Sequence, residues 1–121
     1  DEVIGYALKQ NPGLRERLVL QEKAGIIIGS NPEYGPPGRY DFSFDHLVKV
    51  VEGSLKRLGT DYVDLLAFHR PDPLVEPEEV ARAAEHLHKQ GMVRYFGVSN
   101  HSPSQIELLK KHIDFPLVVN Q

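Results

Sequence analysis

The sequence predicts an α/β fold in which parallel strands alternate with helices, and two observations lead to this prediction. Residues 62–69 form a nearly continuous apolar run that ends at His69, and prolines at positions 71 and 73 follow it. Strands that helices cover on both faces lose the alternation of polar and apolar side chains, so this run is typical of a parallel sheet. Amphipathic helical patterns also alternate with apolar runs along the chain. Such alternation favours parallel strands joined by right-handed crossovers.

Composition excludes several classes of function. The 121 residues include 14 Lys and Arg against 17 Asp and Glu, so the mildly acidic chain has no electrostatic reason to bind nucleic acid or an anionic membrane. No apolar run approaches the roughly 20 residues that span a bilayer. The chain has no cysteine, and its first residues do not resemble a signal peptide. We therefore expect a soluble, cytoplasmic protein without disulfide or thiolate chemistry.

The first 42 residues predict a helix, a strand and a long loop. Residues 1–10 place apolar side chains at helical spacing, and Asn11-Pro12-Gly13 ends the pattern with turn-forming residues. Residues 17–24 begin apolar and become polar, which predicts a strand with Lys23 near its carboxyl end. The segment 25–42 is dense in glycine and proline, so we expect little regular structure there. Loops longer than about 12–15 residues are often functional.

Helix and strand signals alternate through the rest of the chain. Ser43 is a natural N-cap and Gly59 a natural stop for an amphipathic helix between them. Proline and acidic residues at 76–79 open a second helix, which ends at Gly91. A capping box at 102–105 opens a third helix, which extends to about Ile113. Two further short apolar runs predict strands, at 93–98 and 117–119.

Polar residues follow all four predicted strands. They are Lys23, His69, Ser99 with Asn100, and Asn120 with Gln121. Because the carboxyl ends of parallel strands lie at one rim of the sheet, we expect these residues to line a common pocket. Such a set offers a lysine for proton relay, a histidine that donates a hydrogen bond, and amide and hydroxyl groups that suit a carboxamide.

Nucleotide and metal motifs of the usual kinds are absent from the sequence. It contains neither GxGxxG nor GxxxxGK, so a Rossmann or P-loop site is not supported. Histidines at positions 46, 86, 88, 101 and 112 lack the spacing of metal ligands, and we expect them to be surface residues. We therefore expect no metal site.

Three motifs, in this order, resemble the aldo-keto reductases, and in particular a bacterial branch of that family. They are Leu58-Gly59-Thr60-Asp61-Tyr62-Val63-Asp64-Leu65-Leu66 with His69, Gly97-Val98-Ser99-Asn100, and Val119-Asn120-Gln121. The segments Tyr40-Asp41-Phe42-Ser43 and His69-Arg70-Pro71-Asp72-Pro73 are also similar. The resemblance implies an NADPH-dependent enzyme on a (β/α)8 TIM barrel that transfers hydride to an aldehyde or ketone.

The resemblance also implies roles for particular residues. Lys23 and His69 match the catalytic lysine and histidine of the family, and Ser99, Asn100 and Gln121 match the groups that bind the nicotinamide carboxamide. A tyrosine is the general acid in that family. The lysine lowers the pKa of the tyrosine, and the histidine orients the substrate carbonyl.

The chain departs from the family pattern at both ends. The general-acid tyrosine and its aspartate partner precede the helix at 1–10, and the tyrosines at 6, 34, 40, 62 and 95 match other positions. The phosphate-binding segments after the seventh and eighth strands are also missing. We therefore expect residues 1–121 to be a single-domain fragment, a partial barrel equivalent to strands three to six. Its partners would be the rest of its own barrel and a small carbonyl substrate, and alone it should be inactive.

Two other functions remain open at this point. One is a non-catalytic homologue that binds the cofactor and senses redox state. The other is a barrel aldolase in which Lys23 forms a Schiff base. The aldolase is disfavoured, because it gives His69 and the Ser99-Asn100 pair no joint role.

Overall fold

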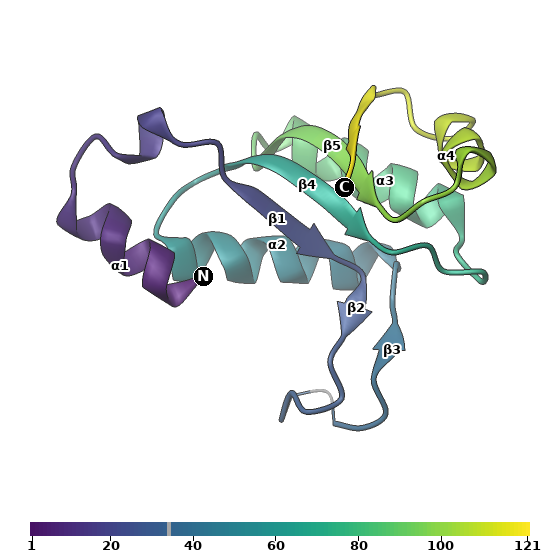
Figure 1. Cartoon of the computed structure of the whole chain (residues 1–121), viewed down its shortest axis with the longest axis horizontal. Coiled ribbons are helices and arrows are strands. Elements are labelled where there is room, and N and C mark those ends of the chain that lie inside the picture. Colours follow the sequence, from purple (N-terminus) through teal and green to yellow (C-terminus); the bar gives the residue numbers. More distant parts are fainter. Residues whose placement is uncertain (34) are drawn as a thin grey trace.

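Four parallel strands form one sheet in the computed structural model, which describes residues 1–33 and 35–121 (Figure 1). The strand order is β1-β4-β5-β6, and Tyr34 lies outside the described residues. The strands are β1 (Gln21–Ala24), β4 (Val63–His69), β5 (Val93–Ser99) and β6 (Leu117–Asn120). The predicted α/β fold with about four parallel strands is therefore confirmed.

Helices precede and connect these strands. They are α1 (Glu2–Gln10), α2 (Phe44–Leu58), α3 (Pro77–Lys89) and α4 (Pro103–Lys110), with a short 3-10 helix at Arg15–Arg17. The helix ends predicted at Ser43 and Gly59 are confirmed. The Ser43 hydroxyl accepts from the His46 N–H at the start of α2, and Gly59 ends the helix in the left-handed conformation with φ of 66°. The capping box that begins α4 is also present. Within the described residues, no helix combines the length and apolar character needed to cross a bilayer.

One apolar core joins the sheet to the helices. Leu66 and Phe68 of β4 and Phe96 and Val98 of β5 are at most 1% exposed, and they pack against the buried faces of α2 and α3. The rings of Phe68 and Phe96 stack with their centroids 6.3 Å apart. The predicted stripe of α3 is fully buried: Val80, Ala83, Ala84 and Leu87. The core therefore lies on the helix-covered face of the sheet.

The first strand is shorter than the predicted 17–24. Pairing of β1 with β4 begins only at Gln21, which lies opposite Leu65. The reason is that the Asp64 side chain replaces a main-chain partner at this position. The Leu20 N–H donates to Asp64 Oδ2 at 3.0 Å instead of to a backbone carbonyl of β4. The Leu20 carbonyl accepts from the N–H groups of both Asp64 and Leu65. Leu20 is thus held to β4 without being part of a regular strand.

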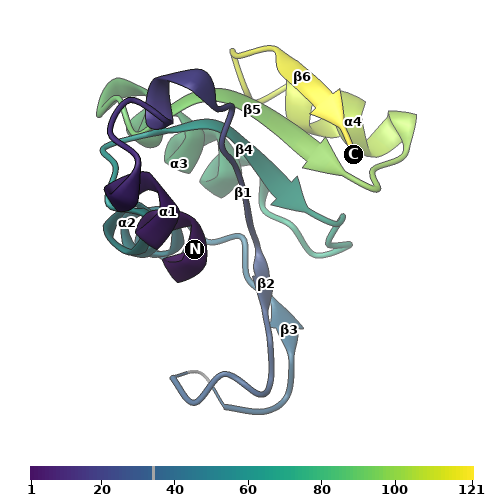
Figure 2. The same cartoon turned by 60° about the vertical axis from the view of Figure 1, so that its left-hand side comes forward.

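The predicted loop at 25–42 contains a small hairpin, which the density of glycine and proline concealed. β2 (Ile26–Ile27) pairs antiparallel with β3 (Arg39–Tyr40). Gly25 links β1 to β2 with φ of 111°, and a Cβ at this position would meet the Phe42 ring. The hairpin projects beyond the carboxyl end of β1, away from the sheet (Figures 1 and 2).

The buried carboxylate of Asp64 links neighbouring segments at the amino end of the sheet. Asp64 Oδ2 lies 2.9 Å from an Arg15 nitrogen, and Oδ1 lies 3.2 Å from an Arg94 nitrogen. Both guanidinium carbons also lie within 4 Å of the Tyr62 ring centroid, at 3.9 and 3.8 Å. The Asp64 and Arg15 side chains are each 12% exposed, so solvent screens this pair less than a surface pair.

This network predicts a large loss of stability in Asp64→Asn. The change keeps the shape of the side chain but leaves the buried Arg15 without a carboxylate. We expect the free energy of unfolding to fall by about 3 kcal/mol, the lower end of the cost of breaking a buried ion pair. Guanidinium unfolding followed by circular dichroism measures the loss. Asp61→Asn, the same change at an exposed residue, is the control, and equal losses in the two variants would contradict the prediction.

The same carboxylate predicts how stability depends on pH. Burial by itself raises the pKa of Asp64, but the Leu20 N–H and the guanidinium groups of Arg15 and Arg94 outweigh burial, so the pKa is lowered in the folded protein. A carboxyl of this kind stabilises the fold fully above its unfolded pKa of about 3.9, and the contribution is lost as the pH falls through the folded pKa. Below about pH 4, the unfolding midpoint should therefore fall more steeply in the parent chain than in Asp64→Asn.

Candidate active site

The polar residues that follow the four strands lie at one rim of the sheet, as predicted. In the strand register, Lys23 is opposite Ala67 and His69 is opposite Ser99. Beyond the end of β5, the Asn100 N–H donates to the Gln121 carbonyl at 2.9 Å, and the Gln121 N–H donates to the Val98 carbonyl at 3.0 Å. The carboxyl ends of β1, β4, β5 and β6 therefore meet at this rim.

Lys23, His69 and Ser99 belong to the sheet face that the helices do not cover, but Ser99 is only 1% exposed. Phe68 and Val98 pack into the core beneath the helices. Neighbouring side chains on a strand point to opposite faces, so His69 and Ser99 belong to the other face. Lys23 shares that face, because its register partner Ala67 is two residues before His69.

A contact between the outermost strands shows that the sheet curves toward this open face. Gln21 Nε2 of β1 donates to Oε1 of Gln121, which follows β6, at 3.0 Å. In a flat sheet these two strands would be separated by three inter-strand distances, or about 14 Å. Two glutamine side chains meet across that span only where the outer strands bend toward each other. The candidate residues thus occupy a concave face.

His69 is half-buried, and its surroundings favour the neutral ring. Burial lowers the pKa of His69, and the positive charges of Lys23 and Arg70 lower it further. The direction and both causes are those expected from the sequence, and the titration itself stays a prediction. A neutral imidazole near pH 7 can donate one hydrogen bond and accept another.

The backbone turns sharply just after two of the candidate residues. Arg70 follows His69 with φ of 64°, and Asn100 follows Ser99 with φ of 59°. Among non-glycine residues this left-handed conformation is uncommon, and asparagine tolerates it better than arginine. Strained residues of this kind cluster at functional sites, where the surrounding structure holds them in place. Their position at the ends of β4 and β5 supports a functional rim.

The groups around Ser99 complement a carboxamide. Asn100 Nδ2 donates to Ser99 Oγ at 3.1 Å, and Gln121 Oε1 accepts from Gln21. Among the described residues, this leaves Asn100 Oδ1 as an acceptor and Gln121 Nε2 as a donor with no protein partner. A carboxamide offers the matching pair, an NH₂ donor and a carbonyl acceptor. These two side chains thus offer one acceptor and one donor to a carboxamide.

Two supporting residues were not predicted in these roles. Asn120 bridges the main chain of His101: its Nδ2 donates to the His101 carbonyl at 2.8 Å, and its Oδ1 accepts from the His101 N–H at 3.2 Å. Gln21 anchors Gln121. Gln21 could have been found in the sequence, because it lies two residues before Lys23 and so shares its face. Asn120 carried no signal beyond its place at a strand end.

The described residues contain no group of three or more His, Cys, Asp or Glu side chains that could hold a metal ion. The expectation that the other histidines are surface residues was wrong for His46, which is 7% exposed. The expectation is confirmed for His88, which is exposed, although its ring centroid lies 4.7 Å from that of Phe115. His46 lies on the buried side of α2, beside the buried Leu47.

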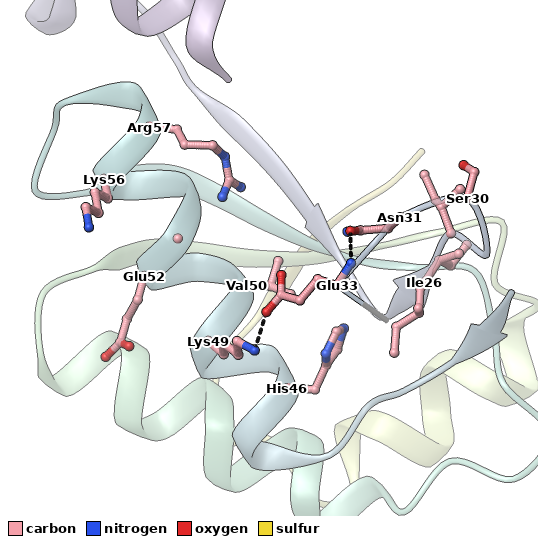
Figure 3. A pocket seen from close by; sticks show the side chains of 13 residues that line it. Ile26, Ser30, Asn31, Glu33, His46, Lys49, Val50, Glu52, Lys56 and Arg57 are labelled. Atoms are coloured by element: carbon pink, nitrogen blue, oxygen red, sulfur yellow. Dashed lines mark hydrogen bonds and ion pairs between the residues drawn. The ribbon is translucent and has the colours of Figure 1, made fainter. Parts of the chain in front are cut away.

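Another hollow in the described chain does not include this site. It has a volume of about 570 Å³ and lies between the β2–β3 hairpin and α2 (Figure 3). Its lining includes His46 and the ion pair of Lys49 with Glu33, and the Asn31 side chain accepts from the Glu33 N–H. None of Lys23, His69 or Gln121 lines it. This hollow is therefore separate from the candidate site.

Comparison with known proteins gives a consistent result. The aldo/keto reductase family matches residues 1–121. The chain is 46% identical to "Oxidoreductase YdhF" of Escherichia coli over 121 residues, which is all of this chain and 40% of that protein. It is 39% identical to a "6-dehydroglucose reductase" of Agrobacterium fabrum over 129 residues, or 41% of that protein.

Solved structures agree with the sequence comparison. The glycerol dehydrogenase AKR11B4 from Gluconobacter oxydans is 32% identical, with a TM-score of 0.83 over 99% of this chain and 35% of that protein. The chain thus spans about 40% of the length of the curated relatives it matches.

The surroundings of His69 predict its titration. Its pKa should lie below the ordinary value of about 6.5. Lys23→Met should raise that pKa, but not to the ordinary value, because burial remains the larger cause. An NMR titration of the imidazole carbon-bound protons measures both. Lys89→Met, which removes an exposed lysine of α3, is the control, and an equal rise in the two variants would count against a charge of Lys23 beside His69.

Proposed function

Because the chain belongs to the aldo/keto reductase family, we propose that it forms the central part, strands three to six, of a barrel that reduces small aldehydes or ketones with NADPH. Its relatives in that family are oxidoreductases. The observation that carries the proposal is the concave face, on which Lys23 and His69 lie beside a set of groups that complements a carboxamide. A hydride donor and a carbonyl acceptor need this kind of juxtaposition.

The residues of this chain would act on the carbonyl oxygen. NADPH, when bound, supplies the hydride for the carbonyl carbon. Neutral His69 donates a hydrogen bond to the carbonyl oxygen, which orients the substrate and polarises the bond. The ammonium of Lys23 favours negative charge nearby, so it lowers the pKa of the acid that protonates the oxygen and stabilises the anion left behind. The products are an alcohol and the oxidised cofactor.

Asn100 and Gln121 would hold the nicotinamide, and Ser99, which is only 1% exposed, would support Asn100 from beneath. Asn100 Oδ1 accepts from the carboxamide NH₂, and Gln121 Nε2 donates to its carbonyl. The left-handed turn at Asn100 and the bond between Gln21 and Gln121 fix these two groups. Preorganised contacts of this kind hold the ring against the substrate without further loss of conformational freedom.

The proposal also explains the surface that the described residues leave open. Tyr95 and Val118 on β5 and β6 are 58% and 53% exposed. β1 and β6 are the outer strands of the described sheet, and each has one unpaired edge. Exposed edges of this kind are aggregation-prone unless they are paired or covered. Further strands of the same barrel would pair both edges and cover the concave face.

The direct test of the proposal is a completed barrel. Residues 1–121 replace the matching 40% of YdhF, and the chimera is assayed with NADPH and a reactive aldehyde. We expect turnover on the order of 1 s⁻¹ or above from the chimera, and none from the 121 residues alone, which lack the family's general acid. Turnover by the 121 residues alone would show that the acid is misassigned. A chimera that binds NADPH without turnover would favour a non-catalytic, cofactor-binding role.

Substitutions in the chimera separate chemistry from folding. We expect Lys23→Met to lower kcat by about 10²-fold or more, the usual contribution of general acid–base catalysis, with little change in the melting temperature. Lys89→Met is the matched control, because that lysine lies on an exposed part of α3. The role assigned to Lys23 fails if the two variants keep the same kcat.

A further inference from the structure

A second cavity lies next to the candidate active site, on the other side of β4. It has a volume of about 270 Å³, and its apolar lining includes Phe42, Phe68, Val75, Val80 and Leu109. Phe68 is adjacent to His69, so the two side chains point to opposite faces of the sheet. The cavity therefore lies among the helices and is separate from the concave face. We call it the α4 cavity, because Leu108 and Leu109 of α4 form one wall.

Two polar side chains at the α4 cavity offer one donor and one acceptor. Gln105 Oε1 accepts from the Ser102 N–H at 2.8 Å in the capping box, which leaves the amide NH₂ as a donor. His101 Nδ1 lies 3.0 Å from the Ser99 carbonyl. A carbonyl only accepts, so Nδ1 carries the proton and Nε2 of the neutral ring is an acceptor. Burial lowers the pKa of His101, although its bond to Ser99 opposes this, and the lowered pKa favours the neutral ring.

The lining of the α4 cavity contains two charged residues of opposite sign. Arg70 and Asp72 both belong to its lining. Asp72 Oδ1 accepts from the Leu74 N–H at 2.9 Å, and the lining carries one positive and one negative side chain. A charged ligand would thus gain little net attraction, yet it would lose its hydration on entering the apolar interior. An uncharged ligand is favoured.

We propose that the α4 cavity binds a small uncharged alcohol or phenol with an apolar body about the size of one ring. The body contacts Pro71, Val75 and Leu108, apolar lining residues that remain accessible above the buried Phe42, Phe68, Val80 and Leu109. The hydroxyl donates to His101 Nε2 and accepts from the Gln105 amide. A hydroxyl is the simplest group that both donates and accepts. The volume is just below the roughly 300–1,000 Å³ of pockets for drug-sized ligands, which agrees with a one-ring compound. The proposal does not rest on the reductase activity.

The test measures binding in the completed barrel without nicotinamide cofactor. Methyl groups of Val and Leu are labelled, and 4-methylbenzyl alcohol is titrated and followed by NMR. We expect saturable shifts centred on Val75, Val80, Leu108 and Leu109, with affinity about fivefold higher than for p-xylene, which lacks the hydroxyl and its hydrogen bonds. The anion 4-methylbenzoate should bind more weakly than the alcohol. Tighter binding of the benzoate would point to an anion site at Arg70 and overturn the proposal.

Two variants and one control variant test the location and the polar contact. Leu108→Trp places bulk from a half-exposed position into the cavity and should abolish binding, whereas Leu74→Trp, in the loop before α3 but outside the cavity lining, should not. Gln105→Glu keeps the capping box but removes the amide donor. It should therefore weaken the binding of the alcohol severalfold and leave the binding of p-xylene unchanged. Methyl spectra away from the cavity confirm that each variant is folded. Unchanged alcohol binding in Leu108→Trp, or equal affinity for alcohol and p-xylene, would overturn the proposal.

Discussion

The arrangement of this sheet depends on the carboxylate of Asp64. It accepts from the Leu20 N–H and pairs with Arg15 and Arg94, so one side chain ties the chain before β1, the strand β4 and the strand β5 together. This contact sets where β1 begins to pair with β4, and hence that Lys23 lies opposite Ala67. A slip of one residue would turn Lys23 toward the helices and away from His69. The position of the candidate lysine therefore follows from a buried ion pair at the opposite end of the sheet.

The two ends of the strands serve different purposes. At the amino end, Asp64, Arg15 and Tyr62 form a compact network of charge and ring contacts. At the carboxyl end, the side chains are polar and the backbone is strained at Arg70 and Asn100. Such strain costs about 1–3 kcal/mol at each residue, so it persists only where the rest of the structure holds it. The core of β4 and β5 with α2 and α3 provides that support, in the division of stability and function that is typical of barrels.

Two adjacent residues of β4 line different parts of the molecule. His69 faces the concave side, while Phe68 lines the α4 cavity. The two spaces are also linked through the main chain, because His101 lines the cavity and its ring contacts the Ser99 carbonyl. Asn120 in turn holds the main chain of His101 to the end of β6. A ligand beside His101 would thus touch the same short segment that positions Asn100.

The sequence by itself determined the alternation of strands and helices, the helix ends at Ser43, Gly59 and Ser102, and the four polar strand ends. These signals are local: periodicity, caps and breakers act within a few residues. Only the tertiary structure decided where β1 begins, because the partner of the Leu20 N–H is 44 residues away. The hairpin within 25–42, the Gln21–Gln121 contact that reveals the curvature, and the burial of His46 likewise depend on residues distant in sequence. A pattern in one segment cannot encode which remote side chain will meet it, since that is set by the packing of the whole sheet.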